Sequence, residues 1–295
     1  MSDDDRRPRR SVLYMPGANE RALDKAASLP ADALILDLED AVAPDAKPAA
    51  RDRVVEAAAA DRYGPREVTI RVNARGTAWH DDDVAAVATS GADAVVVPKV
   101  DGPADVVAVV TALEAAGAPD DLAVWAMVET PAGVFAARDI AEASPRLAAF
   151  VLGTNDLLKE LRAEAVPGRA PLVTALSLVV LAARATGTVV LDGVFNDLSD
   201  DDGFLAECRQ GRDLGFDGKT LVHPRQLAGA NTTFAPSTDE VTHAERVIAA
   251  FTAAEAEGRG VVTVDGRMVE NLHVEQARRT LATASAIARL EESTA

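Results

Sequence analysis

Eight short apolar runs, rich in β-branched residues and each followed by a segment of helical character, constrain the fold of this chain most. The runs are almost continuously apolar rather than alternating, which is typical of strands buried on both faces of a parallel sheet. Several of the segments between them end at a glycine, the residue that most readily terminates a helix. The runs lie at residues 11–17, 33–40, 68–73, 94–100, 123–130, 148–156, 188–193 and 219–224.

Eight such units within about 230 residues predict an α/β fold, a TIM (β/α)8 barrel. The alternative is a doubly wound open sheet, which normally has about five to seven strands and often a Gly-x-Gly-x-x-Gly turn after the first. Here the first turn reads MPGANER (15–21), which lacks that pattern. The barrel is therefore favoured, with residues 1–235 as the catalytic domain.

Residues 236–295 follow a different pattern, in which two helical segments flank a strand and turn near VVTVDGRM (261–268). This pattern predicts a C-terminal helical extension of the barrel. Because so short a segment rarely forms a core of its own, we expect it to serve as a lid or as a contact with a neighbouring subunit.

The formal net charge of −17 argues against nucleic acid or an anionic membrane as a partner, since the field of the protein repels polyanions. It leaves room for a small anion held by a few local arginines and lysines. The charged start, MSDDDRRPRR, is not followed by the apolar h-region of a signal peptide, so we expect no signal peptide or spanning helix and a cytoplasmic location. The single cysteine, Cys208, excludes an intramolecular disulfide.

Polar side chains gather at the C-terminal ends of the predicted strands. In a TIM barrel these ends converge on one mouth, where the chemistry takes place. Packing gives little reason for charged groups at one end of apolar strands, so they are candidates for function. They are Asp37, Glu39, Asp40, Arg71, Asn73, Lys99, Glu129, Asp156, Asp192 and His223.

Glu129 and Asp156 end consecutive predicted strands and should therefore lie on adjacent strands of the barrel. Two carboxylates with water in the other positions suit Mg²⁺, with Mn²⁺ as a substitute. Four histidines, one cysteine and no His-x-x-x-His pair argue against zinc. The alternative is that each acid caps a helix N-terminus or a backbone nest.

Arg71 lies within TIRVN (69–73), where a permanent charge is costly unless it meets an anion. We expect it to bind a substrate carboxylate or thioester oxygen and to stabilise an enolate. A buried ion pair with Asp37 or Glu39 is the alternative. After the first run, Arg21 and Lys25 lie four residues apart on one predicted helix face. They would hold the phosphates of a nucleotide-like cofactor, or form an ordinary solvated pair.

Together these motifs resemble the citrate lyase β-subunit-like family of CoA-ester lyases, in the HpcH/HpaI aldolase superfamily. Nine stretches match in order and span almost the whole chain. They are RSVLYMPGANERALDKA (10–26), LILDLEDAVAPDAK (34–47), TIRVN (69–73), GADAVVVPKV (91–100), VETPAGV (128–134), LGTNDLLKEL (152–161), LDGVFNDLSDDDGF (191–204), LGFDGKTLVHPRQL (214–227) and TVDGRMVENLHVEQARR (263–279).

The resemblance implies a Mg²⁺-dependent carbon–carbon lyase that cleaves or forms a β-hydroxyacyl-CoA such as malyl-CoA or citramalyl-CoA. The products would be acetyl-CoA or propionyl-CoA and a 2-oxo acid, glyoxylate or pyruvate. At matching positions, Glu129 and Asp156 correspond to the metal ligands and Arg71 to the residue that polarises the reacting carbonyl. The resemblance also assigns Gly153, Thr154 and Asn155 to substrate binding, Asp37, Glu39 and Asp40 to the surroundings of the metal, and Tyr14, Pro16, Arg21 and Lys25 to the rim that faces CoA.

The tail departs from the family pattern at one position. Relatives carry an aspartate in a C-terminal Met-[Ile/Val]-Asp motif that is thought to reach the active site, often of a neighbouring subunit. This chain reads RMVEN, with Glu270 in that place, one methylene longer. We expect Glu270 to act as the catalytic acid or base; an N-terminal helix acid favoured by the helix dipole is the alternative. A tail that reaches a neighbour favours a homo-oligomer, a trimer or hexamer.

Two other enzymes share much of this pattern. A CoA-free aldolase of 2-keto acids would use the same metal and make no use of Arg21 or Lys25. A citrate lyase β subunit would act on citryl-acyl-carrier protein within a complex; GTNDL (153–157), where such a subunit would read GAEDY, favours the stand-alone form. Cleavage, condensation and thioester hydrolysis remain open alternatives at this point.

Overall fold

The computed structural model describes residues 7–60, 62–256, 258 and 260–294, and its contacts divide the chain into two compact units. The larger unit, Arg9–Thr233, contains a closed barrel of eight parallel strands that follow one another in chain order. The predicted TIM barrel is confirmed. The strands are β1 (Ser11–Pro16), β2 (Ala33–Asp37), β3 (Glu67–Arg71), β4 (Ala94–Val97), β5 (Ala123–Val128), β6 (Leu147–Leu152), β7 (Val189–Asp192) and β8 (Gly218–Leu221).

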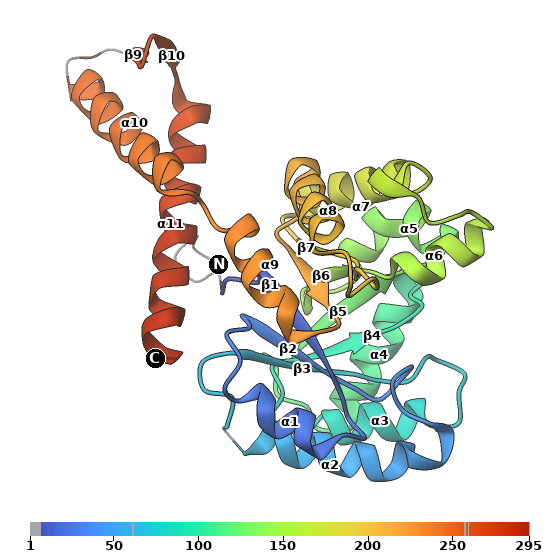
Figure 1. Cartoon of the computed structure of the whole chain (residues 1–295). Coiled ribbons are helices and arrows are strands. Elements are labelled where there is room, and N and C mark those ends of the chain that lie inside the picture. The colour runs from blue at the N-terminus through green and yellow to red at the C-terminus, as the bar shows by residue number, and fades with distance from the viewer. Residues whose placement is uncertain (1–6, 61, 257, 259, 295) are drawn as a thin grey trace. The chain divides into compact units, whose positions relative to one another are not determined.

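Helices surround the strands of the barrel (Figure 1). The glycines predicted to end helices do so: Gly187 follows α7 and Gly215 follows α8, with left-handed φ angles of 77° and 99°. The helices are α1 (Glu20–Ala26), α2 (Lys47–Ala59), α3 (His80–Val87), α4 (Pro103–Ala115), α5 (Pro131–Ala141), α6 (Thr154–Leu161), α7 (Val173–Thr186), α8 (Asp201–Leu214) and α9 (Leu227–Phe234), with short 3-10 turns at Pro44–Ala46, Pro167–Arg169 and Pro224–Gln226.

The register of the strands sets the C-terminal residues of neighbouring strands at one level. Asp37 at the end of β2 pairs with Pro16 of β1 on one side and with Arg71 of β3 on the other. Val128 of β5 pairs in the same way with Leu152 of β6, so that Glu129 and Gly153 follow side by side. A polar residue placed just after an apolar strand is thereby carried to a shared edge.

The interior of the barrel is filled with small and medium apolar side chains, including Val12, Ile35, Val96 and Met127, together with one large residue, Trp125. This fits the scarcity of aromatic residues in the sequence, because the two-sided burial of each strand is met by Val, Leu, Ile and Ala. Among the described residues, no helix has the length and apolar character that a membrane crossing requires.

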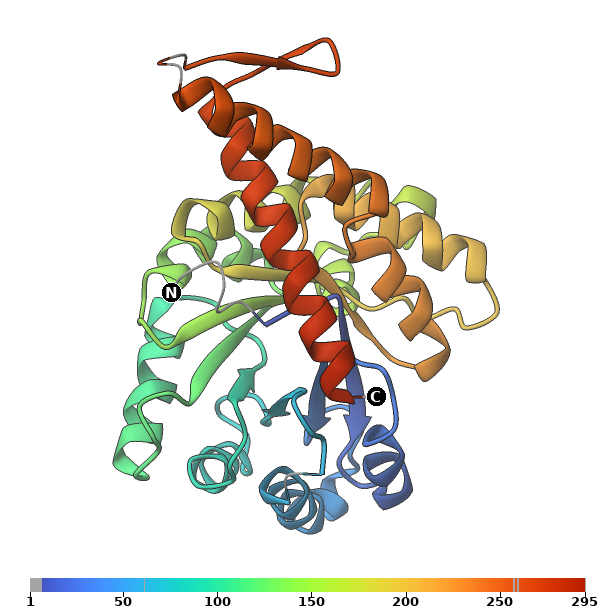
Figure 2. The same cartoon turned by 90° about the vertical axis from the view of Figure 1, so that its left-hand side faces the viewer.

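The second unit is built from the end of the chain, where α10 (Thr238–Ala256) and α11 (Asn271–Thr294) pack side by side (Figure 2). Between them runs a hairpin of β9 (Val262–Val264) and β10 (Arg267–Val269), as the strand-and-turn pattern predicts. The helices and hairpin bury an apolar cluster that includes Val247, Phe251 and Val274. The tail therefore has a core of its own, contrary to the expectation from its length. Its role as a lid or subunit contact stays a prediction.

Candidate active site

A pocket of about 360 Å³ opens at the C-terminal end of the barrel. It brings together residues from both halves of the sequence, as the convergence of strand ends predicts. Side chains that the sequence did not single out, Met127 and Asn196 among them, complete its wall. The predicted site residues that line it are Tyr14, Pro16, Asp37, Asp40, Arg71, Glu129, Gly153, Thr154, Asn155 and Asp156.

Some predicted residues lie elsewhere. Glu39 is buried beside the pocket, where it contacts Arg71. Arg21 and Lys25 are exposed on α1, and Lys25 is in its last turn. Glu270 lies in the second unit at the start of α11, where its carbonyl accepts the N–H of His273 at 2.9 Å, so its catalytic role stays a prediction.

Arg71 is held by acids on two sides. Its Nε and Nη2 donate to the two carboxylate oxygens of Asp37, at 2.6 and 2.8 Å, and Nη1 lies 2.9 Å from Oε2 of Glu39. The ion pair considered as an alternative for Arg71 is therefore present, and the guanidinium still lines the pocket. Burial by itself would lower the pKa of Arg71, but Asp37, Tyr14 and Glu39 together raise that pKa, so the guanidinium stays charged.

Asp37 fixes this arginine because its own position is fixed. Its two oxygens also accept the backbone N–H groups of Glu39 and Ala41, at 2.9 and 3.1 Å. The ring of Tyr14 lies 4.9 Å from the guanidinium carbon on another side. Because Asp37 binds the guanidinium of Arg71 through two hydrogen bonds and Tyr14 covers one of its faces, the orientation of the guanidinium is fixed.

Glu129 follows β5 and is only 2% exposed. Its Oε1 accepts the backbone N–H of Lys99 at 2.8 Å, and a β-carbon at residue 153 would collide with Oε2, so only glycine fits there. Burial raises the pKa of Glu129 to about 7, an effect that Lys99 partly opposes and Glu39 increases. The cap of α5 is Thr130 and α6 has no side-chain cap, so neither acid caps the helix that follows it, whereas Glu129 does bind the backbone N–H of Lys99, in line with the backbone-nest alternative.

Lys99 stands among the acids of the pocket. Its Nζ lies 3.1 Å from Oε1 of Glu39, 3.5 Å from Oδ2 of Asp156 and 3.9 Å from Oε1 of Glu129. Burial alone would lower the pKa of Lys99, but Glu129 and Glu39 outweigh it and raise that pKa. Glu129 and Asp156, which follow β5 and β6, and Glu39, which follows β2, thus surround the ammonium group of Lys99. The sequence placed Lys99 at a strand end but not in the site.

The donor set of this pocket fits a magnesium ion. Oxygens of Glu129 and Asp156 both contact the ammonium group of Lys99, which shows that the two carboxylates can face one cation. Within the described part of the chain, no three His, Cys, Asp or Glu side chains are arranged to hold a metal. The fit is therefore to an ion with two carboxylate ligands and several waters, which is how Mg²⁺ is commonly bound.

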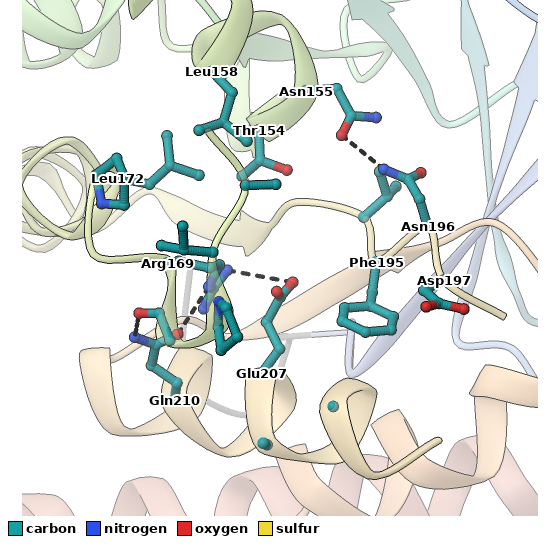
Figure 3. A pocket seen from close by; sticks show the side chains of 18 of the residues that line it. Thr154, Asn155, Leu158, Arg169, Leu172, Phe195, Asn196, Asp197, Glu207 and Gln210 are labelled. Carbon is teal, nitrogen blue, oxygen red and sulfur yellow. Dashed lines mark hydrogen bonds and ion pairs between the residues drawn. The ribbon is translucent and has the colours of Figure 1, made fainter. Parts of the chain in front are cut away.

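A larger cavity, of about 680 Å³, shares Thr154, Asn155, Val194 and Asn196 with the pocket. Figure 3 shows the side chain of Arg169 among the residues that line it, with Glu207 and Gln210 as its partners. Asn155 and Asn196, in the wall common to both cavities, are joined by a hydrogen bond of 2.8 Å (Figure 3).

Four charged side chains at this cavity, two of which line it, are paired with one another. Arg169 donates to both oxygens of Asp192 at 2.7 and 2.9 Å, and Lys219 donates to Asp192 at 3.1 Å and to Glu207 at 2.7 Å. Asp192 and Lys219 are fully buried. Burial also raises the pKa of the neighbouring Cys208 thiol to about 12.

Besides Glu39 and Lys99, which lie next to the pocket, three more strand-end residues expected at the mouth do not line it. Asp192 belongs to the buried group just described, and Asn73 donates to Asp83 at 2.6 Å. His223 caps the short turn after β8, where its Nδ1 accepts the N–H of Arg225. Each finds a local partner, and position at a strand end does not reveal that from sequence.

The chain is similar to a known family and to proteins of known structure. A model described as HpcH/HpaI aldolase/citrate lyase matches residues 10–224. A (3S)-malyl-CoA thioesterase of Cereibacter sphaeroides is 53% identical over 95% of this chain and 96% of the relative. An L-malyl-CoA/beta-methylmalyl-CoA lyase of the same species is 36% identical over 92% and 93%. Protein CitE from Mycobacterium tuberculosis, solved with magnesium, acetoacetate and coenzyme A, has a TM-score of 0.76 and 30% identity, and covers 96% of this chain and 99% of its own.

Proposed function

Because this chain belongs to the HpcH/HpaI aldolase/citrate lyase family, we propose that it is a magnesium-dependent enzyme that acts on malyl-CoA or a similar CoA thioester of a hydroxydicarboxylic acid. The observation that carries the proposal is that Glu129 and Asp156 both face the ammonium group of Lys99, in a pocket that Arg71 also lines. The magnesium bound by the CitE structure supports the choice of metal.

In this proposal Glu129 and Asp156 hold the metal, with Gly153, Thr154 and Asn155 beside the substrate. When bound, Mg²⁺ would polarise the oxygens at the carboxylate end of the substrate. Arg71 would donate to the thioester oxygen as negative charge develops there, and Asp37 keeps the guanidinium from turning away. Glu39, whose pKa is raised by burial although Arg71 opposes the effect, would orient water next to the metal.

Two reactions of such a substrate suit this arrangement. In hydrolysis, water adds to the thioester carbon, the carbon–sulfur bond breaks, and the products are malate and the thiol of CoA. In carbon–carbon cleavage, the hydroxyl loses a proton, the bond next to it breaks, and the products are glyoxylate and an enolate that is protonated to acetyl-CoA. Both place negative charge on the oxygen that Arg71 would bind.

We rank hydrolysis first, because the thioesterase shares 53% of its residues with this chain and the lyase shares 36%, over similar lengths. Carbon–carbon cleavage, which the sequence motifs favour, is the second candidate and is supported by the family to which the chain belongs. Citramalyl-CoA, with pyruvate as the 2-oxo acid, is the alternative substrate of the same class.

The deciding experiment incubates the purified protein with Mg²⁺ and (3S)-malyl-CoA and measures free CoA thiol, malate, glyoxylate and acetyl-CoA. Hydrolysis yields thiol and malate in equal amounts, whereas cleavage yields glyoxylate and acetyl-CoA. Activity should disappear in EDTA and return with Mg²⁺ or Mn²⁺. Full turnover in EDTA, or no turnover of either malyl-CoA or citramalyl-CoA with Mg²⁺ present, would overturn the proposal.

Two further assignments belong to this proposal. We place the phosphates of CoA near Arg21 and Lys25, so Lys25→Glu should raise the KM for the CoA thioester and leave kcat nearly unchanged. A CoA-free aldolase would not respond to that change. We also assign Glu270 as the acid that protonates the enolate, so Glu270→Gln should suppress glyoxylate formation more than hydrolysis. A homo-oligomer would follow if Glu270 serves a neighbouring subunit.

A further inference from the structure

The ammonium group of Lys99 occupies the space that the proposed metal needs. It contacts Asp156 and Glu129, the two proposed ligands, at 3.5 and 3.9 Å, and Glu39 more closely, at 3.1 Å. A lysine ammonium and a divalent cation repel one another at such separations, so they compete for the negative charge of the same carboxylates.

The backbone at Lys99 is in an unusual conformation that serves this cluster. Its φ angle of 53° lies in the left-handed region, which is unfavourable for a residue with a side chain. In that conformation its own N–H points to Glu129, which accepts it at 2.8 Å. The backbone thus fixes Glu129 while the side chain of the same residue neutralises it.

The side chain has somewhere to go. It is 42% exposed, whereas Glu39 and Glu129 are almost fully buried, and its four-carbon stem is flexible. Arg71, which also pairs with the carboxylate of Glu39, is held by Asp37 and Tyr14 and has no such freedom. Of these two side chains, the lysine is the one that can yield its place.

We propose that Lys99 is a displaceable counterion: its ammonium neutralises Glu39, Glu129 and Asp156 in the metal-free protein and moves away from Glu129 and Asp156 when a divalent cation binds them. This inference rests on the proposed metal site. After displacement, the ammonium stays paired with Glu39, its nearest partner. Lys99 therefore weakens metal binding and stabilises the empty site, two effects of opposite sign that a purely structural residue would not produce together.

The test measures Mn²⁺ binding by electron paramagnetic resonance and Mg²⁺ binding by calorimetry, for the wild type and Lys99→Met. Removing the competing charge should tighten divalent binding roughly tenfold or more. In EDTA the same variant should unfold at a lower temperature than the wild type, with a larger gain on adding Mg²⁺. Lys99→Arg, which keeps the charge, should not bind the ion more tightly.

The matched control is Lys159→Met, which removes the same charge from an exposed position on α6. It should change divalent affinity less than about twofold, because a solvated lysine is largely screened. Equal or weaker binding by Lys99→Met, with binding intact in the wild type, would overturn the counterion role alone. Absence of divalent binding in the wild type would overturn the proposed function with it.

A second measurement does not depend on any variant folding. In a crystal structure of the wild type grown with Mg²⁺, Nζ of Lys99 should no longer contact Asp156 or Glu129 and should remain within hydrogen-bonding distance of Glu39. An ammonium still between Asp156 and Glu129 with the ion bound elsewhere would contradict the inference.

Discussion

Two groups of charged side chains at the strand ends differ in how their charges balance. The mouth cluster has five carboxylates and two cations: Asp37, Glu39, Asp40, Glu129 and Asp156 with Arg71 and Lys99. The buried cluster has two of each: Asp192 and Glu207 with Arg169 and Lys219.

The balance shows in the environment of each acid. In the mouth cluster, burial raises the pKa of Glu129 to about 7, and the nearby negative charge of Glu39 raises it further. In the buried cluster, Asp192 receives hydrogen bonds from Arg169, Lys219 and its own neighbour Gly193. A group whose charges cancel holds strands together, whereas a group with excess charge is able to bind an ion.

The largest effect is expected in the buried cluster. Asp192→Asn leaves Arg169 and Lys219 with too little negative charge, and the free energy of unfolding should fall by about 3–5 kcal/mol. Urea denaturation measures it, with Asp202→Asn on the exposed first turn of α8 as the control. A loss under about 1 kcal/mol would show that the balance is not what stabilises this end of the barrel.

The mouth cluster should respond in the opposite way. Glu129→Gln removes one charge from an over-acidic group, so the melting temperature in EDTA should not fall, while turnover drops roughly 10²–10³-fold. Steady-state kinetics on malyl-CoA and a thermal melt give both numbers, with Glu142→Gln on the surface end of α5 as the control. A Glu129→Gln variant with a lower melting temperature and unchanged turnover would contradict the proposed difference between the two clusters.

A change at constant charge sharpens the contrast further. Arg71→Lys keeps the balance of the mouth cluster but loses the bidentate bond to Asp37, so kcat should fall by about 10²-fold while divalent affinity stays within about twofold. Kinetics and Mn²⁺ titration on one preparation separate the two. A large loss of metal affinity would mean that Arg71 organises the acids rather than the substrate.

The smallest effect concerns Cys208, which packs beside the buried cluster. Burial raises the pKa of its thiol to about 12, above the ordinary value, so almost no thiolate forms at pH 8 and an aromatic disulfide reagent should not react with the native protein. Above about pH 9 the unfolded state loses the thiol proton while the native state keeps it, so the free energy of unfolding decreases as the pH rises. Rapid labelling at pH 8 would show that the region opens readily.

Much of the site followed from the chain order of strands and polar residues. The eight runs were each found as a strand, and Glu129, Asp156 and Arg71 meet in one pocket because parallel strands bring their ends together. The position of Lys99 was visible at the end of its run, but its contact with three acids was not. That contact depends on a left-handed backbone at a residue for which the sequence gives no such signal.

What the sequence determined by itself was the barrel, the edge of it that bears charge, and the family, because strand burial and strand-end polarity are periodic along the chain. Only the tertiary structure decided which charges pair. Asp192 and Asp156 look alike after their apolar runs, yet one meets Arg169 and Lys219 in the interior and the other faces the open pocket. Pairing depends on side-chain distances of a few ångströms between residues far apart in the chain, and an electrostatic energy that falls with distance cannot be read from order alone.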